Sequence, residues 1–172
     1  MSVFAGIESA SVGGGSSRNF EPGNFLVRLE GLKVVESKRN QGTKYAIVEC
    51  SVMTFSPGVK QHIDDAIAPT PVPAETFAAG DIVAWKVNLS MGSIAMDNLK
   101  SFGLAVMRAV ALENGQAPKD IGEDQISPAV MDTLFAPNGS PAIGLEMKVE
   151  AFNIFTRAGN PFTKLRWTAK SK

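Results

Sequence analysis

The sequence predicts a mainly β protein: a small, five-stranded, OB-fold-like Greek-key barrel with a helix between its third and fourth strands. Three observations lead to this fold class. Five segments alternate apolar and polar residues with the period of two that half-buried strands show. Residues 95–112 instead repeat apolar residues at intervals of three and four, which is typical of a helix. The first strand also contains Gly31, where a bulge can bend it toward barrel closure.

The first two strands lie within residues 25–53 and form a hairpin. The expected inner face of the first strand consists of Val27, Leu29, Leu32 and Val34, with a shift of parity at Gly31. The expected inner face of the second strand consists of Ala46, Val48, Cys50 and Val52. Its expected outer face consists of Tyr45, Glu49 and Ser51, with Ile47 as the one aliphatic residue out of step. The polar, basic loop at residues 37–43 joins the strands and is suited to binding phosphates.

Three further segments complete the predicted barrel. Residues 81–89 form the third strand, and its expected inner face consists of Val83, Trp85, Val87 and Leu89. Residues 143–155 form the fourth strand, which buries Leu145, Met147, Val149 and Ala151. Residues 162–170 form the fifth, which buries Thr163, Leu165, Trp167 and Ala169. These inner faces follow from the alternation of side chains along a strand.

Two helices are expected between the third and fourth strands. The longer one, over residues 95–112, buries Met96, Leu99, Phe102, Val106 and Val110. Ser93 is the candidate N-cap of this helix, and Gly115 is positioned to end it. Ser127 followed by Pro128 predicts a short second helix through Phe135, because serine caps helices and proline is favoured at the first helical position.

The chain is expected to form one domain with a flexible N-terminal arm. Residues 1–23 make up the arm, because Gly13-Gly14-Gly15-Ser16-Ser17 has the composition of a linker. Its Phe4 and Phe20 can pack on the body or on a neighbouring subunit, so an oligomer is possible. Residues 24–172 form the domain, interrupted at residues 55–80 by an excursion with four prolines and little periodicity.

The charge of the chain is balanced overall but unevenly distributed. Lys plus Arg and Asp plus Glu each number 17. Residues 25–60 contain six basic residues against three acidic, and residues 143–172 contain six against two. A neutral chain therefore presents one basic face if the first hairpin and the last segment meet in space.

The composition also argues against several classes of function. Cys50 is the only cysteine and lies on an apolar face, so a buried thiol is expected and an intrachain disulfide is excluded. His62 with Asp64 and Asp65 lacks the spacing of a metal site, and no cofactor is expected. Without a recognisable nucleophile and base, an enzyme is not expected. Without an apolar run of membrane-spanning length or a secretion signal, we expect a cytoplasmic protein with no membrane partner.

The predicted order of strand, strand, strand, helix, strand, strand is that of the OB-fold. This fold binds oligonucleotides on its second and third strands and on the loops joining strands 1 to 2 and 4 to 5. Here both loops fall in basic segments, and aromatic residues stand beside basic ones, as binding of single-stranded DNA without sequence preference requires. The expected nucleic-acid-binding residues are Lys38, Arg39, Lys44, Tyr45, Lys86, Phe152, Arg157, Phe162, Lys164 and Arg166.

The aromatic residues divide by strand parity. Tyr45 and Phe162 lie opposite the apolar faces of their strands, so we expect their rings on the outer surface for base stacking. Trp85 and Trp167 share parity with buried aliphatic residues, so we expect both in the core.

Four short stretches carry a resemblance to a known family: Pro22-Gly23-Asn24-Phe25, Glu36-Ser37-Lys38-Arg39-Asn40, Tyr45-Ala46-Ile47-Val48-Glu49 and Val83-Ala84-Trp85-Lys86-Val87. The chain resembles phage-encoded OB-fold single-stranded-DNA-binding proteins over residues 22–170. The resemblance implies coating of DNA during phage replication or recombination in the host cytoplasm, without catalysis and with replication or recombination proteins as partners. Many such proteins recruit partners through an acidic tail, whereas this chain ends Ala169-Lys170-Ser171-Lys172.

A structural or assembly protein of a virion is the alternative function. Small β-barrels with flexible N-terminal arms suit this role as well. Its signature would be large apolar contact surfaces, which the arm and the proline-rich excursion can supply. Salt-sensitive binding to oligo-dT distinguishes the two functions.

Overall fold

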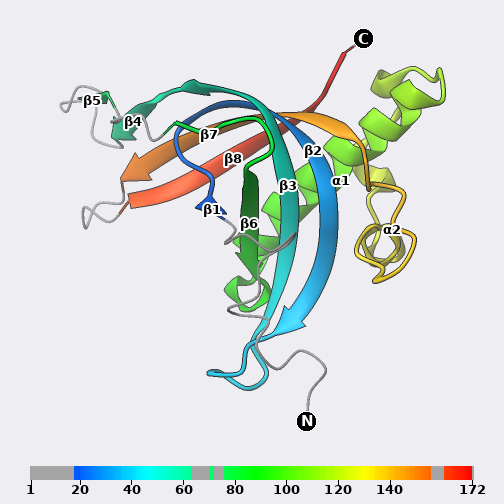
Figure 1. The fold of residues 1–172 in the computed structure, drawn as a ribbon. Helices are drawn as coiled ribbons and strands as arrows, with labels where there is room; N and C mark the ends of the chain where they lie inside the picture. The colour runs from blue at the N-terminus through cyan, green and yellow to red at the C-terminus, as the bar shows by residue number, and fades with distance from the viewer. Residues whose placement is uncertain (1–17, 63–69, 72–75, 156–160, 172) are drawn as a thin grey trace.

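The computed structural model describes residues 18–62, 70–71, 76–155 and 161–171, which form a strongly curled, mainly β structure with two helices (Figure 1). Its strands are β1 (Arg18–Asn19), β2 (Gly23–Glu36), β3 (Lys44–Pro57), β4 (Val59–His62), β5 (Thr70–Pro71), β6 (Ile82–Asn88), β7 (Glu146–Phe155) and β8 (Pro161–Ala169). They lie in one sheet in the order β1-β6-β3-β2-β7-β4-β5, with β8 paired to β7. The mainly β class is confirmed. The expected number of five strands is too low, because the described residues form eight.

The hairpin of β2 and β3 forms the centre of the sheet, as the alternation predicts. The two strands pair antiparallel from Gly23↔Pro57 to Glu36↔Lys44, and the register shifts between Leu29 and Gly31. This shift confirms the predicted bulge. The inner-face residues Val27, Leu29, Leu32, Ala46, Val48, Cys50 and Val52 are all buried, whereas Val34 is 44% exposed.

The outer face of this hairpin is more buried than the sequence suggests. Ile47, the residue out of step, packs there with Val35 and Ala84 in a small second cluster. Glu49, expected to face solvent, is 5% exposed and forms an ion pair with Lys33, with 3.0 Å between Oε1 and Nζ. A Cβ at Gly31 would lie 3.0 Å from the Glu49 carboxylate, so the glycine at the bulge leaves room for that side chain.

An aromatic core fills the hollow between the sheet and the long helix α1 (Ser93–Glu113). Trp167 from β8 lies at its centre. The ring centroid of Trp167 is 4.9 Å from that of Phe102 on α1, 5.8 Å from that of Phe20 and 5.7 Å from that of Trp85. Aromatic pairs in such edge and tilted arrangements add to the stabilisation from burial. The burial of Trp167 confirms the predicted parity of the last strand.

The buried face of α1 differs in its first turn from the expected one. Leu99, Phe102 and Val106 are buried as predicted, but Ala95 is buried and Met96 is 50% exposed. The first turn therefore faces the sheet with its small residue and leaves the larger one at the surface. Gly115 follows the helix with φ +70°, a left-handed conformation that favours glycine, and its N–H donates to the Leu112 carbonyl at 3.1 Å, as expected for a helix end.

The expected capping of the two helices is right for one and wrong for the other. Gly92, and not Ser93, precedes the first turn of α1, and no side chain caps it. The short helix α2 (Pro128–Leu134) begins as predicted, because the Ser127 Oγ accepts a hydrogen bond from the Val130 N–H at 3.3 Å. The loops between α1 and α2 contain two short 3₁₀ turns, Pro118–Asp120 and Glu123–Gln125.

We expect Ser127→Ala to lower the free energy of unfolding by about 0.5–2 kcal/mol, because it removes the N-cap of α2. Urea unfolding followed by circular dichroism measures this change. Ser93→Ala is the matched control and should leave the stability unchanged or slightly higher, since the Ser93 side chain caps nothing. A larger loss for Ser93→Ala than for Ser127→Ala would contradict the caps described above.

The expected arm and excursion contribute more to the body than the sequence suggests. Of the expected arm, Arg18 and Asn19 form β1, and Phe20 is buried in the core at 4% exposure. Of the excursion, Phe55 and Phe77 pack with Phe25 at centroid distances of 4.6 and 5.2 Å. Residues 1–17, 63–69 and 72–75, which include Phe4 and most of the proline-rich centre, lie outside the described residues.

The sheet has a seam between β6 and β8. The short strand β1 pairs in parallel with β6 only at Val83 and Ala84, and β8 pairs with β7 alone among the described strands. The edge of β6 from Trp85 to Asn88 therefore has no strand partner in the described part of the chain. None of the described helices has the length and apolar character needed to cross a membrane.

Candidate nucleic-acid interface

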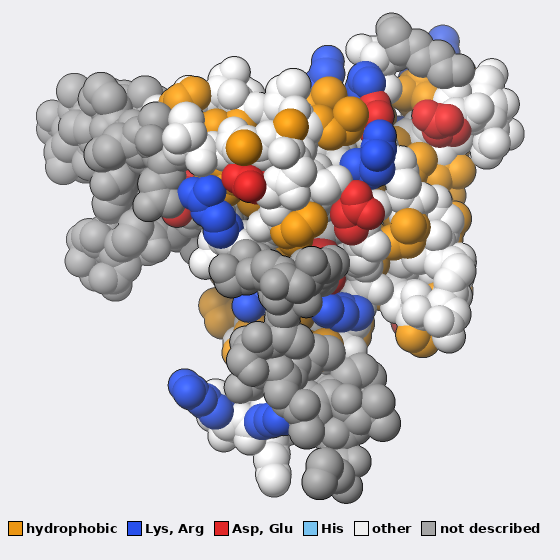
Figure 2. Space-filling model, viewed as in Figure 1, with side chains coloured by type: hydrophobic (Ala, Val, Ile, Leu, Met, Phe, Trp, Pro, Cys, Tyr) orange, Lys and Arg blue, Asp and Glu red, His pale blue; other side chains and the backbone are white. Residues whose placement is uncertain are grey.

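The loop between β2 and β3 is held by its own hydrogen bonds. The Ser37 N–H donates to the Thr43 carbonyl at 2.8 Å, and the Gly42 N–H donates to the Glu36 carboxylate at 2.8 Å. Lys38 and Arg39 are exposed at the tip of this loop. Figure 2 shows blue side chains at the lower tip of the molecule, which is the end of this hairpin in Figure 1. The backbone thus holds the two cations outward.

Two further exposed lysines follow the loop, Lys44 on β3 and Lys86 on β6. Lys86 lies on the outer face and pairs across the ladder with Ile47, whereas Lys44 is the first residue of β3 and shares the parity of Ala46. Within the described residues, Lys44 and Lys86 take part in no ion pair. Tyr45 pairs with Asn88 on the outer face, but its ring is half-buried against the outer cluster of Val35, Ile47 and Ala84. Tyr45 is therefore less free to stack than the sequence suggests.

The basic residues of β7 and β8 are arranged differently. Arg166 forms an ion pair with Glu150, with 2.8 Å between Nη1 and Oε2, and its guanidinium lies 5.6 Å from the centre of the half-buried Phe152 ring. Hydrogen bonds from Lys170 and Arg28 lower the pKa of the Glu146 carboxyl on the same face. Acidic partners thus offset part of the positive charge on this outer face. Lys164, which directly follows Thr163, is exposed.

Two of the expected binding residues cannot be placed. Phe162 belongs to β8, where its backbone pairs with Ile154, but its side chain lies outside the described residues. Arg157 lies outside them entirely, as do residues 63–65 of the His62 motif.

Cys50 is fully buried as expected, and this burial, with the nearby carboxylates of Glu30 and Glu49, raises the pKa of its thiol. No group of three potential metal ligands occurs among the residues that the structure describes.

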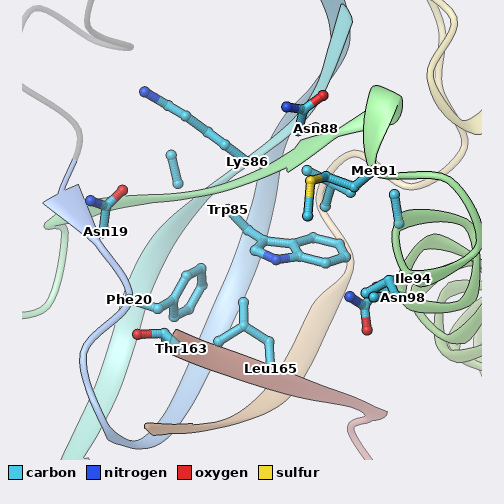
Figure 3. Close-up of a pocket in the computed structure, with 13 residues that line it drawn as sticks. Asn19, Phe20, Trp85, Lys86, Asn88, Met91, Ile94, Asn98, Thr163 and Leu165 are labelled. Atoms are coloured by element: carbon cyan, nitrogen blue, oxygen red, sulfur yellow. The ribbon is translucent and has the colours of Figure 1, made fainter. Parts of the chain in front are cut away.

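A pocket of about 460 Å³ occupies the seam between β6 and β8, next to the start of α1 (Figure 3). We call it the seam pocket. Its polar lining comes from Asn19, Lys86, Asn88, Asn98 and Thr163. Its apolar lining includes Phe20, Trp85, Met91, Ile94 and Leu165. None of the residues that line it carries a carboxylate. A ligand with a negatively charged group next to the part that enters the pocket would therefore not be repelled by the lining.

Two residues on the rim of the seam pocket lie close to basic residues outside it. Asn88 on its rim pairs with Tyr45, which follows Lys44 at the end of the basic loop. Thr163 on the other side precedes Lys164. Asn19 of β1 and Thr163 of β8, more than a hundred residues apart in sequence, also border this one hollow.

Trp85 is the residue of this site that the sequence did not reveal. Its parity places it on the inner face of β6, and it packs against the core as predicted. It is nevertheless only half-buried, because none of the described strands covers the edge of β6 beside it, and its ring lines the seam pocket. Alternation in the sequence shows on which face a residue lies, but it does not show where a barrel stays open.

A comparison of the chain with protein-family models and with curated proteins finds no match. The resemblance to phage single-stranded-DNA-binding proteins therefore rests on the short stretches quoted above.

Proposed function

We propose that the protein binds single-stranded DNA without sequence preference and protects it during replication or recombination. In this proposal β2, β3, β6, β7 and β8 are the five strands of an OB-fold, a partly open Greek-key barrel. The pairing order β6-β3-β2-β7-β8 and the place of α1 between β6 and β7 support this assignment. The basic loop after β2 and the connection between β7 and β8 would then flank the bound strand.

The observation that carries the proposal is the position of the seam pocket between two groups of basic side chains. Lys86 lies on the β6 side of it, and Lys164 follows the lining residue Thr163 on the β8 side. Lys44 precedes Tyr45, the ladder partner of Asn88 on the rim, while the hollow itself offers an aromatic ring and amides (Figure 3). A basic path with a stacking surface is what binding to a single strand needs, because phosphates and bases then each find a partner. A duplex keeps its bases stacked inside, so it cannot use the hollow.

We expect the affinity for oligo-dT to fall steeply as salt is added, because bound lysines and arginines release the counterions condensed on the strand. The log-log slope is about −0.7 for each phosphate neutralised on a single strand. Fluorescence anisotropy of a labelled oligonucleotide at several salt concentrations measures the slope. Arg39→Ala and Lys86→Ala should each make the slope shallower by about 0.7.

Two controls accompany this titration. A duplex of the same length should bind more weakly than the single strand under the same conditions. The affinity for single-stranded RNA of the same sequence shows whether binding depends on the sugar. A slope near zero, or equal affinity for duplex and single strand, would overturn the proposal and favour a structural role.

A further inference from the structure

We propose that the seam pocket binds one unstacked nucleobase of a bound strand, which stacks on the ring of Trp85. This inference rests on the proposed function and adds a defined base-binding site to it. Contacts to phosphates alone would leave every base in solvent. The pocket instead offers one base a surface hollow lined by side chains.

The first argument is the way Trp85 is held. Its ring centroid lies 5.7 Å from that of Phe102 and 5.7 Å from that of Trp167, so the core supports it from within. Figure 3 shows the indole in the middle of the pocket, with Met91 and Leu165 on either side. Because the ring is packed against the core but still partly exposed, a base can stack on it without the full entropic cost of ordering the side chain.

The second argument is the chemistry of the rim. A nucleobase edge carries both hydrogen-bond donors and acceptors, and side-chain amides supply both. Asn88 accepts a hydrogen bond from the Ser90 N–H through Oδ1 at 2.9 Å, which fixes the amide and leaves its NH₂ group to donate. Asn19 and Asn98 add two further amides from β1 and α1. Amides of this kind accept several bases, which agrees with binding without strict sequence preference.

The third argument is size and charge. A volume of about 460 Å³ lies at the small end of the range for ligand pockets, about 300–1,000 Å³, and suits a single planar ring system. Lys86 is the charged residue of the lining and extends away from the ring in Figure 3. It is positioned for the phosphate next to the inserted base. The occupant is therefore one nucleotide of a longer strand.

Tryptophan fluorescence tests the base position directly, because the chain contains only two tryptophans. Trp167→Phe leaves Trp85 as the sole tryptophan, and Trp85→Phe leaves the buried Trp167 as the matched control. Oligo-dT should quench the first protein and leave the second nearly unchanged. Anisotropy of the labelled oligonucleotide, recorded in parallel, shows whether the strand is bound.

An affinity measurement gives the second test. Trp85→Ala should weaken binding of oligo-dT by about 5-fold to 150-fold, the range that loss of one stacked base implies. It should leave binding of an abasic strand of the same length unchanged. Trp85→Leu keeps apolar contact with the core but removes the ring, so it replaces the alanine variant if that variant is unfolded by circular dichroism.

The outcomes separate this inference from the proposed function. If the strand binds but Trp85 fluorescence does not change, or if Trp85→Leu binds oligo-dT as tightly as the wild type, the base site is wrong and strand binding stands. If the wild-type protein binds no single strand at all, both proposals fail.

Discussion

Trp167→Ala is expected to lower the free energy of unfolding by about 3–5 kcal/mol, the range for truncating a large buried aromatic side chain. Trp167 is 8% exposed and contacts the rings of Phe20, Trp85 and Phe102. Its removal would leave a cavity among these three rings, each of which comes from a different part of the fold. Urea unfolding followed by circular dichroism measures the loss, because it does not depend on the tryptophan that is removed.

Two comparisons make this result specific. Trp167→Phe should cost much less, because it keeps an aromatic ring and removes the indole N–H, a buried donor without a hydrogen-bond partner among the described residues. Tyr45→Ala should cost less than Trp167→Ala, since Tyr45 is only half-buried on the outer face. A greater loss for Tyr45→Ala would mean that the inner and outer faces of the sheet have been exchanged.

The sequence was sufficient to predict the central hairpin and the core face of each long strand. Val27, Leu29 and Trp167 are buried as predicted, because a period of two specifies one face wherever that face is covered. The bulge at Gly31 was also predictable, since the apolar parity changes there. These features depend on neighbours along the chain and on the general geometry of strands.

The predictions of burial fail where contacts with distant segments of the chain determine whether a residue is buried. Glu49 follows the polar parity, yet Lys33 and the space beside Gly31 allow its burial. Phe77 belongs to a segment without periodicity, but Arg18 lies 3.9 Å over its ring and Phe25 packs beside it. The local sequence around Glu49 or Phe77 does not indicate these contacts. Burial of this kind depends on tertiary contacts, which overrule the local pattern.

The sequence was sufficient to predict the exposed basic residues of the candidate site, but it was not sufficient to predict the seam pocket. The basic loop at Lys38 and Arg39 is exposed, as expected from its polar composition. The seam pocket instead depends on β6 and β8 failing to pair, and on the start of α1 lying beside both. An element order indicates which strands are neighbours, but it does not indicate which pair stays apart.

The largest functional effect is expected from reversing two charges at the basic loop between β2 and β3. Arg39→Glu combined with Lys44→Glu should lower the affinity for single-stranded DNA by about 100-fold or more at 0.1 M salt. Removing the neutralisation of one phosphate weakens binding about 5-fold at this salt, because the affinity varies with salt to the power of about −0.7 per phosphate, and reversal adds repulsion. Fold and stability should change little, since both side chains are exposed.

The matched control carries the same type of charge reversal elsewhere. Lys100→Glu combined with Lys119→Glu alters two exposed lysines, on α1 and on the turn that follows it, that are not part of the proposed binding residues. This variant should lose much less affinity than the loop variant, because it changes the overall charge and leaves the residues that neutralise phosphates in place. Equal losses in the two variants would mean that net charge alone governs binding, and the path from the β2–β3 loop to the seam pocket would then be wrong.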